Sequence, residues 1–525
     1  MTPIYLDYAA STPVDPRVAT AMAEWLATPS EQANPASATH WPGLAANDRV
    51  EQARGAVGAL ILAEKREIVF TSGATEANNL ALLGVAAAAR RAGRHGHFVS
   101  SRVEHKSVLD ALGQLEKEGF AVTLLQPDEQ GRVSPEAVRT ALRDDTLLVS
   151  LMLANNETGV LNDVAGIKRI SDHHGFLLHT DASQAVGKVP VNVIELGADF
   201  LSLTAHKFYG PKGIGALYVR ESARPRIAPI QFGGGHERGL RPGTLPTHQI
   251  VGFGMAAALA REHLVRDGAH ARDLANRLWR ELESIAGVEF NSQRERGVPG
   301  LVNASFPGIE GESLVTGLTG IAVSTGSACS SATREPSYVL RALGRGTELA
   351  QSSLRLSLGR FTTAADVDAA ATAIRDEVAR LRTLAGDAAG APVAGATLPL
   401  ASLLARNLNG QAQRYFLAPA RPLRFSVGSM SGVRHGSAGR PQEGTAICFE
   451  LEIADKIVKS ARFSAYGCPH TLAVTAWLCE VVEGARLEAG LPGTPHDWAE
   501  NFDVPMEKLG RLLIVEDALR AAYAA

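Results

Sequence analysis

The sequence predicts an α/β protein with a large central mixed, mostly parallel sheet, a small α+β domain, and a separate C-terminal α+β unit. From Glu67 to Arg220, short apolar runs alternate with longer helical patterns, which is typical of strands joined by crossover helices. Beyond Val251 the pattern changes to long helices rich in Ala, Leu and Arg. A stretch of Ala, Gly and Pro without periodicity, residues 387–399, then indicates a linker.

The expected strands are short apolar runs that begin at Glu67, His97, Thr146, Gly175, Ala198 and Ile214. Two further strand candidates, residues 287–292 and 301–307, follow the first long helical pattern, and a last helical pattern covers 364–386. We therefore predict a large domain at 16–255, a small domain made of 1–15 and 256–385, a linker at 386–398, and a C-terminal domain at 399–525. In the C-terminal domain we expect two alternating strands joined by a turn, and a helix after Gly467.

Composition sets limits on the function. With 45% hydrophobic residues, 20% charged residues and a formal net charge of -3, the chain shows no electrostatic bias toward nucleic acid or a membrane, and we expect neither as a partner. The start of the chain lacks the pattern of a secretory signal, and no apolar run is long enough to span a bilayer, so a cytoplasmic location is expected. His95 and His97 have no cysteine or carboxylate at ligand spacing, so we interpret them as surface residues and expect no metal site.

Only four cysteines occur, which is too few for a disulfide scaffold and leaves each as a candidate reactive thiol. Two of them fall within strand and helix patterns and are expected in the core: Cys448 and Cys479. The other two, Cys329 and Cys468, lie outside such patterns and are considered below.

The first candidate site is the junction between the strand at Glu67 and the following helix, in the segment EIVFTSGATEANNLA. Ser72, Gly73, Ala74 and Thr75 lie where unpaired backbone N–H groups and the positive end of a helix dipole can hold a phosphate. A glycine-containing turn that merely caps a helix fits this feature equally well.

Polar side chains also follow two later strands. Asp181 and Gln184 follow the run FLLHTDASQ, and Thr204, His206 and Lys207 follow ADFLSLTAHK. Because ligands in open α/β sheets bind beyond the carboxyl ends of the strands, we expect these side chains to meet in one crevice. A surface lysine after a strand is the alternative explanation of Lys207, whereas a Schiff-base lysine needs a site that tunes its pKa.

A phosphate cradle, a strand-end aspartate and a strand-end Thr-x-His-Lys in this order resemble the fold-type I pyridoxal-phosphate enzymes. More closely, the chain resembles the cysteine desulfurase family from its first residues to about Ala385. The motifs that carry this resemblance are LDYAASTP, NPAS, TSGATEANNLA, VEHKSV, NNETGV, TDASQ, TAHKFYGPKGIGALYV, GGGHERGLRPGT, STGSACSSA, EPSYVLRALG and LRLSLGRFTT.

The resemblance implies the following roles. Lys207 would form the Schiff base with pyridoxal 5'-phosphate and later remove the Cα proton of the substrate. Asp181 would pair with the pyridine nitrogen, which makes the cofactor an electron sink. Gln184 would contact the ring hydroxyl, and His105 would stack on the ring and transfer protons.

The resemblance also implies how phosphate and substrate are held. The phosphate would take backbone N–H groups and the side chains near the cradle, with one residue from a neighbouring subunit of a homodimer: Ala74, Thr75, Thr204, His206 and, from that subunit, Thr244. Arg355 would bind the carboxylate of the substrate, L-cysteine, as a bidentate fork. Asn34 and Asn156 would lie near this fork, and Asn156 would also contact the cofactor.

Cys329 lies in AVSTGSACSSATREPSYVL, a small and polar segment with little to pack against a core. By itself this pattern also fits an unreactive loop cysteine. Within the resemblance, Cys329 is the nucleophile that takes sulfur from cysteine as a persulfide, as a thiolate activated by a nearby base such as His105. The sulfur would serve iron-sulfur cluster assembly or another acceptor protein. Alternatives are a selenocysteine or cysteine-sulfinate lyase, and a partner-recruiting platform with little activity.

The C-terminal domain resembles the scaffold family on which iron-sulfur clusters are assembled, where a Tyr-Gly-Cys turn opens a helix as it does at Cys468. The remaining cysteine motifs of that family are replaced by Glu443, Gly444 and Thr445 and by Gly510 and Arg511. Because clusters require thiolates, an ordinary scaffold function is in doubt. Cys468 at a helix start is a possible sulfur acceptor, while a docking or dimerisation module with a leftover cysteine is the alternative.

Overall fold

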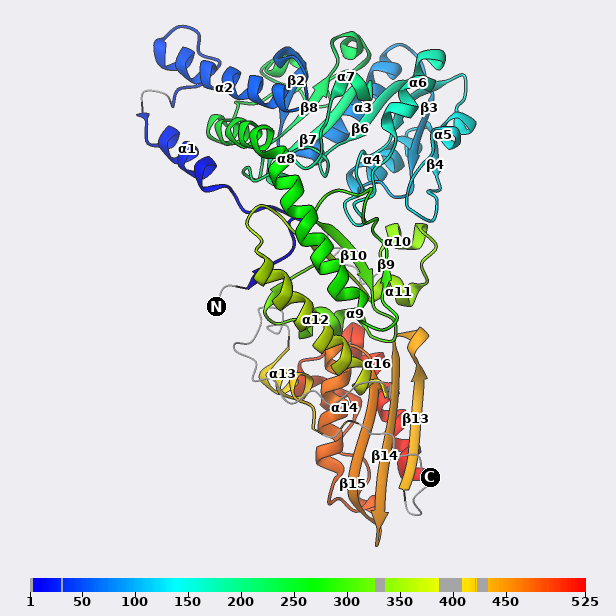
Figure 1. Ribbon diagram of the computed structural model, residues 1–525. Helices are drawn as coiled ribbons and strands as arrows, with labels where there is room; N and C mark the ends of the chain where they lie inside the picture. Colours follow the sequence, from blue (N-terminus) through cyan, green and yellow to red (C-terminus); the bar gives the residue numbers. More distant parts are fainter. Residues whose placement is uncertain (1–2, 30–31, 326–335, 387–407, 421, 423–432) are drawn as a thin grey trace.

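The computed structural model describes residues 3–29, 32–325, 336–386, 408–420, 422 and 433–525. Figure 1 shows an elongated molecule in which the large domain, the small domain and the C-terminal domain follow one another along one axis. The long helix α8 (Thr247–Glu283) runs from the large domain into the small one. The predicted boundary between residues 255 and 256 therefore falls inside a continuous helix.

The large domain is built on a seven-stranded sheet in the order β2-β8-β7-β6-β5-β3-β4. Strands β3 to β7 run parallel to one another, and only β8 is antiparallel to both of its neighbours. The mixed, mostly parallel sheet is thus confirmed, with one strand, β4, that we did not predict. The strands are β2 (Ile68–Thr71), β3 (His97–Ser101), β4 (Ala121–Leu125), β5 (Thr146–Ser150), β6 (Leu177–Asp181), β7 (Phe200–Thr204) and β8 (Gly215–Val219).

Helices cover both faces of this sheet, because its strands are apolar on both sides. One face packs against α3 and α4, and the other packs against α2, α6, α7 and α8, which gives two separate hydrophobic cores. The helices of the large domain besides α8 are α1 (Pro16–Leu26), α2 (Trp41–Leu60), α3 (Ala74–Arg91), α4 (Lys106–Lys117), α5 (Pro135–Ala141), α6 (Val164–His174) and α7 (Val193–Leu196).

The prediction of a surface position for His97 is wrong. His97 opens β3, has no exposed surface, and bonds Thr146 Oγ1 at 3.0 Å and Thr123 Oγ1 at 2.8 Å. Burial and the charge of Arg143 lower the pKa of this imidazole. A histidine can be accommodated inside a central strand when both ring nitrogens find hydroxyl partners on neighbouring strands.

The small domain contains a three-stranded antiparallel sheet in the order β12-β10-β9, and a parallel pair, β1 with β11. The N-terminal segment thereby joins the small domain. The strands are β1 (Ile4–Tyr5), β9 (Glu289–Phe290), β10 (Leu301–Ser305), β11 (Ile321–Ala322) and β12 (Ser353–Ser357), and the helices are α9 (Gly311–Gly317), α10 (Tyr338–Ala342), α11 (Thr347–Gln351) and α12 (Ala364–Leu384).

The C-terminal domain is a three-stranded antiparallel sheet packed against helices. The predicted hairpin is β14 with β15, and the helix after Gly467 is α14, but β13 escaped prediction because RHGSAGR lacks apolar alternation. Cys479 is fully buried as expected, whereas Cys448 is only partly buried. The elements are α13 (Gly410–Leu417), β13 (Val433–Arg440), β14 (Thr445–Ala454), β15 (Ile457–Tyr466), α14 (Pro469–Val482), α15 (Pro495–Phe502) and α16 (Leu509–Ala524). Nearly all of the predicted linker lies outside the described residues.

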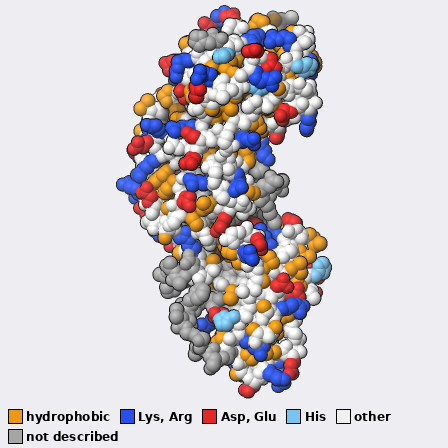
Figure 2. Space-filling view, turned by 90° about the vertical axis from the view of Figure 1, so that its right-hand side faces the viewer, with side chains coloured by type: hydrophobic (Ala, Val, Ile, Leu, Met, Phe, Trp, Pro, Cys, Tyr) orange, Lys and Arg blue, Asp and Glu red, His pale blue; other side chains and the backbone are white. Residues whose placement is uncertain are grey.

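Acidic and basic side chains are interspersed over the face of the molecule in Figure 2. Among the described helices, none combines the length and the apolar character that a bilayer crossing needs.

Candidate active site

The site begins where β6 and β7 end at the same edge of the sheet. Lys207 closes the short 3-10 turn Ala205–Lys207 after β7, and its Nζ donates to the carbonyls of Ala9 at 2.6 Å and Ala10 at 2.9 Å. Gln184 Nε2 donates to the same Ala9 carbonyl at 2.8 Å. The N-terminal segment therefore forms one wall of the crevice in which the predicted lysine and glutamine meet.

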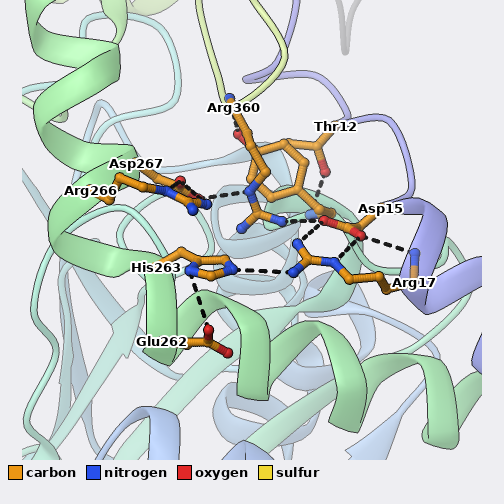
Figure 3. A network of polar contacts seen from close by, with 9 residues as sticks. Thr12, Asp15, Arg17, Glu262, His263, Arg266, Asp267 and Arg360 are labelled. Atoms are coloured by element: carbon orange, nitrogen blue, oxygen red, sulfur yellow. Dashed lines mark hydrogen bonds and ion pairs between the residues drawn. The ribbon is translucent and has the colours of Figure 1, made fainter.

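A network of charged residues holds this wall in place (Figure 3). Arg360 donates to Asp15 at 2.6 Å and to Asp267 at 2.7 Å, so that it joins the N-terminal segment to α8. Hydrogen bonds from Arg17 and Arg360 lower the pKa of Asp15 well below its ordinary value, against the effect of burial. Thr12 donates to the carbonyl of His206 at 3.0 Å, so the network reaches the residue next to Lys207. These contacts fix the carbonyls that receive the Lys207 ammonium.

Asp181 is held by three donors at the end of β6. Its Oδ1 accepts from the backbone N–H of Ser183 at 2.9 Å and from the Ser183 hydroxyl at 2.6 Å. Its Oδ2 accepts from Asn78 Nδ2 at 2.7 Å, and this amide also donates to Ser107 Oγ at 2.9 Å. Donors to both oxygens fix the direction of this carboxyl group.

The chain of contacts continues to His105, the N-cap of α4. Ser107 donates its backbone N–H to His105 Nδ1 at 3.1 Å, and its hydroxyl oxygen lies 2.8 Å from the same nitrogen. Because a backbone N–H can only donate, Nδ1 is an acceptor and the neutral ring carries its proton on Nε2. One amide and one hydroxyl thus connect the predicted partner of the pyridine nitrogen with the predicted proton-transfer residue.

Two buried carboxyl groups lie beside this chain. Burial raises the pKa of Glu104 well above its ordinary value, although the Met152 N–H donates to its Oε1 at 2.8 Å. Burial also raises the pKa of Glu157, against the effects of a hydrogen bond from Ser337 and the charge of Arg355. Both groups therefore hold a proton at a higher pH than an exposed glutamate would.

The predicted phosphate cradle lies at the start of α3. Gly73 is the N-cap, and no side chain caps this end of the helix within the described residues. Thr204 Oγ1 donates to the Ile214 carbonyl at 3.1 Å, which leaves its oxygen able to accept. A Cβ added at Gly215 would lie 2.7 Å from Gly73 Cα, so only glycine lets β8 pass this close to the cradle.

His206 lies next to this cradle with its ring in a cationic environment. Burial and the charges of Lys207, Lys212 and Lys188 lower its pKa to about 4, so it is neutral at physiological pH and available as a neutral donor.

Arg355 lies on β12 of the small domain and faces the large domain. Its guanidinium donates to the Asn156 carbonyl at 2.9 Å and pairs with Asp7 at 2.8 Å. Arg355 Nε and Asn156 Oδ1 are buried and have no hydrogen-bond partner among the described residues. The Arg355 guanidinium is thus held in place, and its Nε–H can still donate a hydrogen bond to a further polar ligand.

Two predicted residues lie apart from this group. The side chains of Asn34 and Thr244 are exposed; Asn34 accepts a hydrogen bond from the nearby Ala36 N–H, and Thr244 makes no side-chain hydrogen bond within the described parts of this one chain. Cys329 lies outside the described residues.

The two ends of the segment that carries Cys329 are anchored near the site. On one side, the backbone of Ser324 pairs with that of Arg355. On the other side, Ser337 bonds the Glu157 carboxyl at 2.5 Å, and the Tyr338 hydroxyl donates to the Glu104 carbonyl at 2.7 Å.

Sequence reasoning missed several residues that orient this site. Three of them lie within the motifs of the sequence analysis: Asn78, Ser107 and Asp7. They were not predicted as site residues, because the groups that react directly belong to neighbouring residues of the same motifs. Lys188 donates to Gln184 Oε1 at 2.6 Å, and burial, together with the charges of Lys207 and Arg355, lowers its pKa to about 7. The only signal available for these residues was that they are polar residues inside otherwise apolar or small-residue segments.

The fold and site define a class of protein, and comparisons with known proteins agree. Residues 4–370 match the family model Aminotransferase class-V, and residues 423–525 match the model NifU-like N terminal domain. A cysteine desulfurase IscS of Aeromonas hydrophila subsp. hydrophila is 53% identical over 382 residues, which cover 73% of this chain and 94% of that protein. An IscS of Pseudomonas putida is 52% identical with the same coverage.

Solved structures lead to the same class. A NifS-like protein superposes with a TM-score of 0.67 at 35% identity, covering 72% of this chain and all of its own length. A structure described as SspA in complex with cysteine superposes with a TM-score of 0.61 at 36% identity, covering 68% of this chain and 99% of that one. The chain belongs to the cysteine desulfurase family, with a NifU-like domain at its C-terminal end.

The residues present fit pyridoxal phosphate, the cofactor of the class. An amine, a fixed carboxylate, a neutral histidine and a helix start without a side-chain cap lie at one edge of the sheet, from Lys207, Asp181, His206 and Gly73. By contrast, no group of three metal-ligating side chains occurs among the described residues.

Proposed function

We propose that this chain converts L-cysteine to L-alanine and leaves the sulfur as a persulfide on Cys329. The observation that best supports this proposal is the chain of hydrogen bonds from Asp181 through Asn78 and Ser107 to His105, beside Lys207. It joins a carboxylate to a proton carrier, and the Lys207 amine follows the neighbouring strand β7 at the same edge of the sheet. Pyridoxal-dependent chemistry on an amino acid needs all three groups.

The residues of the site would divide the work as follows. The first turn of α3, with Ala74 and Thr75, would hold the phosphate together with Thr204 and His206. Bound pyridoxal phosphate supplies an electron sink for the carbanion formed at the substrate Cα. Gln184 and Asp181 would orient the ring, and Lys207 would anchor the cofactor and then take the Cα proton on Nζ. His105, with its proton on Nε2, would donate that proton toward the reacting atoms.

Arg355 would hold the substrate carboxylate with its bidentate fork, assisted by Asn156 and Asn34. Because Asp7 neutralises the guanidinium at 2.8 Å, the substrate would join an existing ion pair and use the hydrogen-bonding capacity left at Nε. This arrangement would keep Arg355 fixed before the substrate arrives.

In the sulfur step, the Cys329 thiolate would attack the sulfur of the substrate. A bond forms between the two sulfur atoms, the bond between that sulfur and the substrate Cβ breaks, and the carbon skeleton takes up protons to leave as alanine. Two thiols thus give one persulfide and one C–H bond, so no external oxidant is needed. We place the protein in the cytoplasm, because a reducing compartment keeps cysteine thiols such as Cys329 free to react.

We also propose a homodimer in which Thr244 of one subunit completes the phosphate site of the other. The exposed position of Thr244 supports this, and so do two large apolar side chains left on the surface, Trp41 at 64% and Phe232 at 79% exposure. The sulfur would leave for an acceptor protein in iron-sulfur cluster assembly. Cys468 as an internal acceptor remains a prediction, and its setting is described below.

The test is production of alanine and sulfide from L-cysteine with a thiol reductant, for the wild type, for Cys329→Ala and for a control, Cys448→Ala. We expect turnover in the wild type and in the control, and cofactor binding with almost no sulfide in Cys329→Ala. Full activity of Cys329→Ala would contradict the persulfide step and indicate a selenocysteine or cysteine-sulfinate lyase. Cofactor binding without turnover in the wild type would indicate a partner-recruiting platform instead.

A further inference from the structure

The C-terminal domain meets the small domain through the end that carries Cys468. Ser313 at the start of α9 donates its hydroxyl to the Gly467 carbonyl at 2.7 Å, and both groups are buried. Tyr466 donates its hydroxyl to the Ile309 carbonyl at 3.4 Å. The contact therefore joins the Tyr-Gly-Cys turn itself to the N-terminal end of α9.

Opposite charges face each other across this contact. The small domain contributes Glu310 and Glu312, and the C-terminal domain contributes Lys508 and Arg511. Lys508 Nζ lies 2.5 Å from Glu312, with only 2% of the lysine side chain exposed, and Arg511 Nη1 lies 3.8 Å from Glu310. A nearly buried lysine paired across a domain boundary is costly to leave unpaired, so the Lys508–Glu312 pair favours a single docked arrangement.

Apolar packing continues across the same boundary. Leu314 and Leu318 of the small domain belong to one hydrophobic cluster with Leu472 and Ala473 of α14. Helices α12 and α13, which precede and follow the predicted linker in the sequence, are also in contact: Arg380 of α12 donates to a carbonyl of α13 at 2.9 Å. The two domains thus share a core, as permanently associated domains do.

Cys468 lies in the middle of this contact with no exposed surface. It is the N-cap of α14, and its Sγ lies 3.2 Å from Thr471 Oγ1. Burial lowers the pKa of the Arg511 guanidinium, but the neighbouring Cys468 and Glu310 outweigh this effect, so the pKa is raised. The thiol is therefore enclosed between a cation of its own domain and an acidic helix end of the other.

This setting does not suit a cluster or an iron ion. Arg511, at one of the positions where a cysteine motif was expected, reaches the thiol, and its Nη2 lies 3.8 Å from where a Cβ on Gly444 would be. Gly444, at another position where a cysteine motif was expected, thus faces the same guanidinium. A fixed positive charge beside the only thiol repels a metal cation, and the described residues supply no other thiolate there.

We propose that the C-terminal domain is a resident cap on the α9 surface of the desulfurase and does not act as a cluster scaffold. Lys508 docks on Glu312, and the docked domain seals Cys468 from solvent and from any other protein that would bind this surface. Sulfur can reach Cys468 from solution only when this ion pair opens. The inference does not depend on turnover, because sealing and docking are properties of the resting protein.

The first experiment measures alkylation of Cys468 by N-ethylmaleimide in the full chain, with peptide mass spectrometry to resolve each cysteine. In the wild type we expect Cys468 to react far more slowly than in the denatured chain. Lys508→Glu, which places like charges across the contact, should accelerate Cys468 alkylation by about tenfold or more, because one broken, nearly buried ion pair shifts an equilibrium by at least that factor. The double variant Lys508→Glu with Glu312→Lys should restore most of the protection.

Cys479 is the internal control, because it is fully buried in α14 of the same domain but away from the contact. Undocking leaves Cys479 protected, whereas unfolding exposes both thiols, so a variant that fails to fold is recognised directly. Wild-type Cys468 that reacts as fast as in the denatured chain would overturn the sealed interface. A double variant as reactive as Lys508→Glu would overturn the proposed charge pairing.

The second experiment adds ferrous iron and sulfide to the wild type and to Cys468→Ser under anaerobic conditions, followed by desalting and iron analysis. We expect equal, negligible iron in both. Iron retained by the wild type and lost in Cys468→Ser would overturn the proposal, since the domain would then be a working scaffold.

Discussion

Replacement of Glu310 by glutamine tests the electrostatics of the interdomain contact most directly. Glu310 caps α9, where its Oε2 accepts from the Ser313 N–H at 2.7 Å, and a glutamine oxygen can keep this bond. The substitution therefore removes a charge while it leaves the helix cap and the shape of the contact in place. The charged or titratable groups that face Glu310 from the packed elements are Glu312, Tyr466, Cys468, His470, Lys508 and Arg511.

Burial, together with Glu312 and Cys468, raises the pKa of Glu310 from its ordinary value of 4.5 to about 7. When the domains separate, we expect the pKa to return toward the ordinary value. The docked form therefore holds a proton that the open form releases between these two values. Docking is strongest below about pH 4.5, weakens as the pH rises to about 7, and then stays at its weaker level.

The size of this effect follows from the difference of 7 - 4.5 = 2.5 pKa units. At about 1.4 kcal/mol per unit, it amounts to about 3 kcal/mol, or on the order of a hundredfold in the opening equilibrium. Glutamine resembles the protonated acid, so Glu310→Gln should lack this penalty. At pH 8 the variant should open about a hundredfold less often than the wild type, whereas at pH 5 the two should differ only a few-fold.

The assay is the alkylation rate of Cys468 from pH 5 to pH 8, divided by the rate of the same cysteine in the denatured chain to remove the ionisation of the thiol. Glu488→Gln is the matched control, because Glu488 is 62% exposed and pairs with Lys456 at the surface. Equal pH dependence in the wild type and Glu310→Gln would refute the reasoning, and so would faster labelling of Glu310→Gln at pH 8.

Three further predictions concern the large domain. Asp181→Asn should lower kcat by about a hundredfold or more with the cofactor still bound, because an amide in place of the carboxylate loses the fixed charge opposite the ring nitrogen; absorbance and steady-state rates check this. Asn78→Ala should lower kcat roughly tenfold and shift the pH profile, since it disconnects Asp181 from the histidine network, while Asn79→Ala, which loses only a bond to a helix carbonyl, should leave both unchanged. Glu237→Gln should destabilise the protein by about 3 kcal/mol in urea unfolding, because it removes the buried one of the two carboxylates that pair with Arg54 and leaves only the partly exposed Glu51; a loss below about 1 kcal/mol would contradict this.

Much of the large domain could be predicted because its parallel strands are buried on both faces. Each of the six expected runs is apolar enough to stand out, and all six form strands of the seven-stranded sheet. The strand order and the antiparallel direction of β8 could not be predicted, because they depend on which strands pair and not on local pattern. Strand β13 was missed for a related reason: its residues pair through the backbone and carry few apolar side chains.

The candidate site shows the same division. Reactive residue types such as Lys207, Asp181 and His105 could be selected from their motifs, since their chemistry is visible in the sequence. The residues that orient them, such as Asn78 and Ser107, have no chemistry of their own, and their importance follows only from distances. His97 shows the opposite error, because its burial depends on two hydroxyls from other strands.

The sequence alone determined the class of fold, the order of the motifs and the absence of the expected cysteines from the C-terminal domain, because these depend on residue type and spacing. Only the tertiary structure decided that Cys468 is enclosed against α9, that Arg511 reaches it, and that Glu310 and Glu312 face Lys508 and Arg511. The physical reason is that burial and ion pairing arise between residues almost two hundred positions apart, and their free energy depends on distance and solvent exclusion, which no local pattern encodes.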